Sequence, residues 1–362
     1  MRILSLDGGG IRGIVSLAIL EALSKQTTDS RWLDTVNLFA GNSTGGLIAL
    51  GLANNVSIED LKALYIIHGA SIFRSRWPGM LKLIANAFRA RYRLDPLEQH
   101  VRDVLKDATL GDLPRKVMIA SFDVIGREKD LGAAQHQQRW RAKFFHNFDG
   151  LGNSSESGPQ CDWNQPAWKV ALYTASAPVF FPIIDGYVDG GVAANNPSMA
   201  ALALTQDPRY FSARESSLDR QAPAARRIAG EFPTFIAARR APAIPSEVRL
   251  LSIGTGQSHD KIAAPRNGRK SWGFLSWINP FGKPGTPLLS VMMEGDTNVP
   301  HFQCAAILGN NQRRIQINFD SGRTFDMDEP SQIPELLAYL DTPAVKEQIA
   351  EVALWLDTVW RT

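Results

Sequence analysis

The segment GNSTG places Ser43 between Gly41 and Gly45, directly after an apolar run and before a helical pattern over 44–53. On a tight strand-to-helix turn this spacing pushes the serine hydroxyl out of the backbone, and the helix N-terminus favours developing negative charge. Such a pentapeptide is common and is also typical of an ordinary turn. Ser43 is therefore a candidate nucleophile for attack on a carbonyl, provided that the chain also supplies a base and an oxyanion site.

A second glycine-rich segment, DGGGIRG at 7–13, follows the first apolar run. Consecutive glycines at a helix N-terminus expose backbone N–H groups, which suit either an oxyanion or a phosphate. The spacing does not match a phosphate-binding P-loop. It does fit G-x-G-x-x-G, but a dinucleotide site also needs an acidic residue about 20 positions later, at the end of the second strand. Asp29 and Asp34 precede that strand. The segment predicts an oxyanion site, with a non-catalytic nucleotide or phosphate site at Gly8–Gly13 as the alternative.

The usual base for a serine nucleophile is histidine. The chain has six histidines: His68, His100, His136, His146, His259 and His301. None lies in a glycine-rich loop at the end of an apolar run, whereas Asp189 does, because Gly190 and Gly191 follow it directly. These glycines would let the Asp189 carboxylate reach Ser43 and accept its proton, if the oxyanion site stabilises the intermediate strongly. The alternatives are an ordinary Asp-Gly turn and a Ser–His–Asp esterase that uses one of the six histidines.

The composition indicates a globular protein. Of the 362 residues 44% are hydrophobic and 21% are charged, and the formal net charge is only +3, which argues against disorder and against a polymeric nucleic acid as partner. The two cysteines, Cys161 and Cys304, are too few for a disulfide scaffold or a cysteine-based zinc site. The N-terminus enters a strand pattern at once, and no apolar run reaches about 18 residues. We therefore expect a cytoplasmic protein without a signal peptide, a spanning helix or a bound metal.

Short apolar runs alternate with helical patterns, which predicts an α/β fold with a mainly parallel sheet. The run at 14–24 is apolar on nearly every face, as in a helix that is buried against a sheet. The tail over 334–360 is expected to form one or two helices. The expected strands are 2–6, 36–40, 116–124, 143–148, 248–254 and 313–319.

Three stretches interrupt this pattern. Residues 69–95 are basic, with no acid before Asp95, and their apolar positions fit an amphipathic helix. Such a helix would either cap the core or contact an anionic lipid or ligand. Residues 205–246 are rich in Ala, Pro and Arg and are expected to be an insertion. Residues 270–288 combine aromatic residues with Gly and Pro, which fits a lid, a segment at a membrane interface, or packing against the domain.

Three motifs in this order, DGGGIRG, GNSTGG and DGG, resemble those of the patatin-like phospholipases. The resemblance covers about residues 1–256 outside the insertions, and it includes ALYTASAPVFFP at 171–182 and LSIGTG at 251–256. It implies a three-layer α/β/α sandwich and an acyl hydrolase with a Ser–Asp dyad, in which Ser43 is the nucleophile and Asp189 is the base. The oxyanion loop would contain Gly8, Gly9, Gly10 and Arg12, and the residues Gly41, Gly45, Gly190 and Gly191 would support the two catalytic motifs.

The resemblance also implies a substrate class, namely lipid acyl esters and chiefly membrane phospholipids, and chemistry that needs no metal or cofactor. We expect one acyl hydrolase domain over 1–362 that makes peripheral contact with a membrane, while Arg12 orients the oxyanion loop or pairs with a phosphate. In length the chain is similar to bacterial members that act as effectors of anti-phage signalling. A cyclic dinucleotide is therefore the expected activator, and a constitutive lipid esterase is the alternative.

Overall fold

A computed structural model of the chain describes residues 1–75, 89–126, 140–148, 162–206, 245–257, 272–278, 287–320 and 323–361. Most of the three expected insertions, at 69–95, 205–246 and 270–288, lies outside these ranges. The same is true of the amphipathic helix expected within the first of them. These features, and the extent of a single domain, therefore stay predictions.

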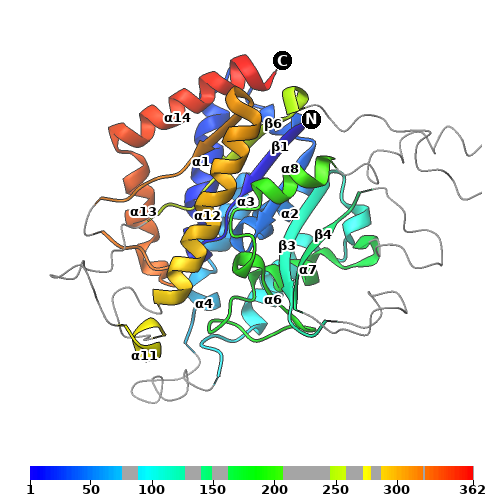
Figure 1. Cartoon of the computed structure of the whole chain (residues 1–362), viewed down its shortest axis with the longest axis vertical. Coiled ribbons are helices and arrows are strands. Elements are labelled where there is room, and N and C mark those ends of the chain that lie inside the picture. Colours follow the sequence, from blue (N-terminus) through cyan, green and yellow to red (C-terminus); the bar gives the residue numbers. More distant parts are fainter. Residues whose placement is uncertain are drawn as a thin grey trace, which may run out of the picture.

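A seven-stranded sheet lies at the centre of the fold (Figure 1). The strands are β1 (Arg2–Leu6), β2 (Leu38–Asn42), β3 (Lys116–Asp123), β4 (Arg141–His146), β5 (Tyr187–Asp189), β6 (Arg249–Ile253) and β7 (Gln312–Ile315). Their order is β4-β3-β2-β1-β6-β7, with β5 beside β3. All pairs are parallel except those of β4 and β5 with β3. The predicted mainly parallel sheet is confirmed, although the short strand β5 was not expected.

The helices follow the strands, as the alternating pattern predicted. They are α1 (Gly13–Gln26), α2 (Thr44–Ala53), α3 (Ile58–Ile66), α4 (Gly69–Ile72), α6 (Asp95–Leu105), α7 (Ala167–Ala175), α8 (Ser198–Gln206), α11 (Phe274–Trp277), α12 (Pro287–Leu308), α13 (Ile333–Leu340) and α14 (Pro343–Trp355). The last two, with a π-helical turn over Leu356–Trp360, confirm the helical tail. Among the helices that the structure describes, none is both long enough and apolar enough to cross a membrane.

Helices cover both faces of the sheet, because successive strand residues point to opposite sides. Leu4 and Phe39 contribute to a core with α1, α2, α3, α6, α7, α13 and α14. Their neighbours Ile3 and Leu38 contribute to a second core with α8 and α12. Figure 1 looks onto the layer that α8 and α12 form, with the strands and α1 behind it. The three-layer α/β/α sandwich is confirmed.

Candidate active site

Ser43 occupies a strained turn between β2 and α2. Its φ of +52° lies in a region that non-glycine residues rarely adopt. A Cβ atom on Gly41 would lie 2.3 Å from the carbonyl oxygen of Gly45, and one on Gly45 would lie 2.2 Å from the carbonyl oxygen of Leu6. The two glycines are required because the first turn of α2 packs directly on the ends of β1 and β2. The spacing of GNSTG thus has a steric origin.

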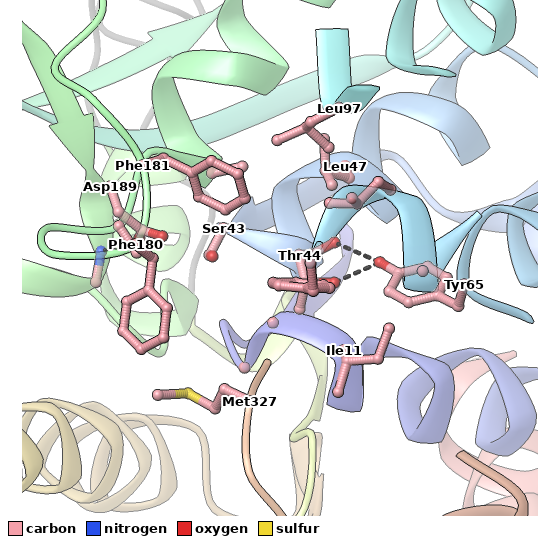
Figure 2. Close-up of a pocket in the computed structure, with 18 of the residues that line it drawn as sticks. Ile11, Ser43, Thr44, Leu47, Tyr65, Leu97, Phe180, Phe181, Asp189 and Met327 are labelled. Atoms are coloured by element: carbon pink, nitrogen blue, oxygen red, sulfur yellow. Dashed lines mark hydrogen bonds between the residues drawn. The ribbon is translucent and has the colours of Figure 1, made fainter. Parts of the chain in front are cut away.

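Two helices hold this turn in place. The Ser43 N–H donates to Oγ1 of Thr174 on α7 at 2.7 Å. The Thr44 hydroxyl hydrogen-bonds the hydroxyl of Tyr65 on α3 (Figure 2). With its backbone fixed from both sides, Ser43 presents its side chain to the pocket that Figure 2 shows.

The pairing of β3 brings Asp189 next to Ser43. β2 pairs with β3 as far as Asn42, which lies opposite Ala120. The next residue of β3, Ser121, pairs with Asp189 of β5. Since β4 occupies the other edge of β3 along the same residues, β5 takes the place of β2 where β2 ends. Asp189 therefore lies directly beyond the carboxyl end of the strand that carries the candidate nucleophile.

The Asp189 carboxylate is buried, with 5% of its surface exposed. Its Oδ1 accepts a hydrogen bond from the Gly191 N–H at 2.7 Å. Burial raises the pKa of Asp189 to about 6, and hydrogen bonds from Ser43, Gly191 and Asn42 lower it in part. A carboxylate with this pKa is ionised at neutral pH but binds a proton more readily than a solvated aspartate. These are the properties that a general base for Ser43 needs.

The glycine-rich loop lies on the other side of Ser43. Gly8 donates its N–H to the Asn195 carbonyl at 3.1 Å, so this amide is already used. Within the described residues no partner accepts from the N–H groups of Gly9 and Gly10, and both glycines line the pocket. Gly10 has a φ of +58°, and a Cβ there would lie 2.2 Å from the Met327 carbonyl oxygen. The loop continues into a short 3-10 helix over Gly10–Arg12, which the Arg12 N–H stabilises by donating to the Gly9 carbonyl at 3.2 Å.

Asn195 connects the three motifs, a role that the sequence did not reveal. Its side-chain oxygen accepts from Nδ2 of Asn42 at 3.4 Å, and its carbonyl accepts from Gly8. Asn195 in turn is held by two residues of α12. Its N–H donates to Asp296 Oδ2 at 2.5 Å, and its Nδ2 donates to Thr297 Oγ1 at 2.9 Å. The only signal in the sequence is the position of Asn195 a few residues after DGG. Its partners come from distant segments, so the pattern could not identify it.

The pocket around Ser43 has about 940 Å³ of empty space, including part of its open mouth. The described residues that line it are mainly aliphatic and aromatic, and none of them is Lys, Arg or His. Representative wall residues are Leu47, Leu64, Phe180, Phe181, Val192 and Met293. An extended acyl chain suits such walls better than a nucleotide phosphate does.

The described histidines lie elsewhere. His68 and His100 stack on each other with ring centroids 3.8 Å apart, His146 is in β4, and His301 contacts Gln312. The remaining two fall outside the described ranges. Within those ranges no group of three or more His, Cys, Asp or Glu residues could hold a metal ion. The described part of the chain thus offers Asp189, and no histidine, as the neighbour of Ser43.

Comparisons with known proteins show what the whole chain is similar to. The family model described as patatin-like phospholipase matches residues 4–202. Patatin-like protein 2 of Oryza sativa subsp. indica is 26% identical over 365 residues, covering 91% of this chain and 80% of that protein. CotR of Bacillus subtilis is 27% identical over 372 residues, covering 97% of this chain and 93% of CotR. The crystal structure of VipD from Legionella pneumophila is a remote match, with a TM-score of 0.36 and 13% identity; the match covers 99% of this chain and 66% of VipD.

Proposed function

Because the chain belongs to the patatin-like phospholipase family and is a lipid acyl hydrolase, we propose that it cleaves phospholipid acyl esters with Ser43 as nucleophile and Asp189 as general base. One observation carries this proposal. Ser43 stands on a strained strand-to-helix turn in the wall of an apolar pocket, and the buried side chain of Asp189 lines the same pocket. The dyad needs no third residue, because the Gly191 N–H already orients the carboxylate.

In the proposed reaction, Asp189 takes the proton of the Ser43 hydroxyl as Oγ attacks the ester carbonyl carbon. The tetrahedral intermediate collapses, the alcohol leaves with the proton from Asp189, and an acyl-enzyme remains on Ser43. Asp189 then removes a proton from water, which attacks the acyl-enzyme and releases the fatty acid. The Ser43 oxygen recovers its proton from Asp189, so each step is balanced without a metal or cofactor.

The free N–H groups of Gly9 and Gly10 are the proposed oxyanion donors. Gly8 keeps a positioning role, because its N–H is bound to Asn195. Arg12 orients the loop from the end of the 3-10 helix that Gly10 begins. A single oxyanion donor contributes about 100- to 1,000-fold to kcat, and this compensates for the weakness of a carboxylate as base towards an alcohol.

The further expectations, namely action at a membrane surface from the cytoplasm and activation by a cyclic dinucleotide in anti-phage defence, rest on the sequence resemblance. The same holds for the alternative, a constitutive lipid esterase. These two readings share the dyad and differ in whether the pure protein reacts without an added nucleotide. One labelling experiment therefore addresses both.

A fluorophosphonate probe is expected to modify Ser43 of the purified protein. Labelling would be followed by gel fluorescence, and the modified peptide identified by mass spectrometry, with Ser43→Ala as control. Parallel arms with and without a panel of cyclic dinucleotides separate the gated from the constitutive enzyme. Labelling that survives in Ser43→Ala, or none in any arm, would contradict the proposed dyad.

The dependence of activity on pH follows from the raised pKa of Asp189. With a soluble ester, kcat/KM should be constant above pH 7 and fall about tenfold per pH unit well below pH 6, because only the ionised carboxylate accepts the Ser43 proton. The midpoint should move little with temperature, since ionisation of a carboxyl group has a small enthalpy. A profile that is flat down to pH 5, in protein shown by circular dichroism to stay folded, would rule out Asp189 as base.

A further inference from the structure

The outer face of α12 is apolar and exposed. Phe302 is 72% exposed, and the other members of the face are exposed as well. Because they follow each other at helical intervals, they form one stripe along the side of α12 that points away from the sheet. The residues of this stripe are Leu288, Val291, Met292, Val299, Phe302 and Ala306.

A surface helix usually has a polar outer face. The inner face of α12 is already buried, with Cys304 and Leu308 in the core against the sheet. The helix has only two charged residues, Glu294 and Asp296, and Asp296 is engaged by the Asn195 N–H. α12 thus has one buried apolar side and one exposed apolar stripe, which the exposed polar residues Asn298 and Gln303 border. An exposed apolar stripe of this kind is typical of a contact surface.

The N-terminal part of the stripe lies next to a residue that lines the pocket. Met293, next to Met292 of the stripe, lines the pocket beside Ser43. The short helix α11 contacts α12 and lies near its N-terminal end (Figure 1). On α11, Phe274 is 75% exposed, and Trp277 packs edge-on against Trp272 with centroids 5.2 Å apart. Aromatic side chains of this kind are favoured at the boundary between lipid and water.

We propose that the stripe on α12, together with α11, is the surface by which the protein binds a lipid bilayer. This inference rests on the proposed function, since a phospholipid substrate must leave a bilayer to enter the pocket. The stripe lies next to Met293 of the pocket lining, and none of its own side chains is charged or forms hydrogen bonds, so it is better suited to acyl chains than to a specific protein partner. A helix with this stripe lies in the interfacial plane and buries its apolar face among the acyl chains.

The chemistry of the stripe determines how binding responds to salt. Ionic contacts with anionic headgroups weaken as salt screens them. The stripe has no Lys or Arg, so its contribution comes from burial of apolar surface and should persist in high salt. Replacing Phe302 with aspartate is expected to reduce partitioning onto vesicles about tenfold or more, equally at 0.1 M and 0.5 M NaCl.

The test measures co-sedimentation with large phosphatidylcholine vesicles, using Ser43→Ala protein so that the lipid stays intact. Phe302→Asp is compared with Leu354→Asp, which changes an apolar side chain of similar exposure, 66%, on α14. Thermal unfolding confirms that both variants fold. Weaker binding by Phe302→Asp alone supports the surface, whereas equal binding by all three proteins overturns it.

Two further outcomes are also decisive. If the parent protein is a dimer in light scattering, and Phe302→Asp becomes a monomer without losing vesicle binding, a second copy covers the stripe and the proposal fails. If the two aspartate variants lose binding equally, the stripe has no special role and the proposal also fails. A soluble ester assay on the protein with Ser43 intact tests the proposed function separately, because it requires no vesicle.

Discussion

Replacing Asp189 with asparagine is expected to reduce kcat/KM about 1,000- to 10,000-fold and, at pH 8, to raise the free energy of unfolding. The loss of activity follows from removal of the only group placed to accept the Ser43 proton within the described residues. Asparagine has nearly the same shape, and its side-chain oxygen can still accept the Gly191 N–H. The oxyanion site and the nucleophile therefore stay in place, and a small residual rate is expected.

The gain in stability follows from the direction of the pKa shift. Burial raises the pKa of Asp189 from 3.8 to about 6, so the folded state favours the protonated carboxyl. The contribution of the protonated Asp189 carboxyl to the free energy of unfolding is complete below pH 4 and is lost as the pH rises through 6. This lowers the free energy of unfolding of the parent by about 3 kcal/mol at most. Asparagine cannot ionise. Between pH 4 and 6 the Asp189→Asn variant should therefore become increasingly more stable than the parent, and the difference should persist above pH 6.

Ser43→Ala is the matched control for this prediction. It should lose activity at least as completely, but it leaves the buried carboxylate in place and so should not gain stability at pH 8. Chemical denaturation of the three proteins at pH 4.5 and pH 8 gives the comparison, and a soluble ester gives the rates. Asp189→Asn protein that is active, or that is less stable than the parent at pH 8, would contradict the assigned role of Asp189.

Residue types were sufficient to single out Ser43 and Asp189 as candidates, but not to predict how the fold brings them together. Ser43 and Asp189 each lie beside glycines at the end of an apolar run, a local signal that can be read without a structure. Their proximity depends on β5, a strand of three residues that was not predicted. Its place on β3 is set by pairing with residues more than 60 positions away. Non-local register of this kind leaves no periodic pattern in so short a segment.

For the proposed oxyanion loop, too, the sequence predicts the residues but not their contacts. Three consecutive glycines predict a nest of three amides, and each has the freedom to adopt the required backbone. The distant residue Asn195 then takes the Gly8 N–H, while Met327 accepts from the residue after Gly10. Which amides stay free is thus decided by tertiary contacts. The sequence proposes all three glycines as donors, whereas within the described residues only the N–H groups of Gly9 and Gly10 have no acceptor.

Replacing Gly45 with alanine is expected to lower the free energy of unfolding by about 2–3 kcal/mol and kcat/KM about 100-fold or more. The new methyl group would lie 2.2 Å from the carbonyl oxygen of Leu6, a backbone atom that cannot rotate away. α2 must therefore move off the end of β1. Since Ser43 is the residue before the first turn of α2, the hydroxyl moves with it, and a displacement of about 1 Å is enough for a loss of this size.

Gly51→Ala provides the comparison within the same helix. A methyl group there would meet Cδ2 of Leu61 at 2.5 Å, which is the end of a flexible side chain that can shift. The helix preference of alanine over glycine offsets this cost by about 0.5–1 kcal/mol. Gly51→Ala should thus remain within about 1 kcal/mol of the parent and keep its activity. If the two variants behaved alike, the contact between α2 and β1 would not be the reason for glycine at position 45.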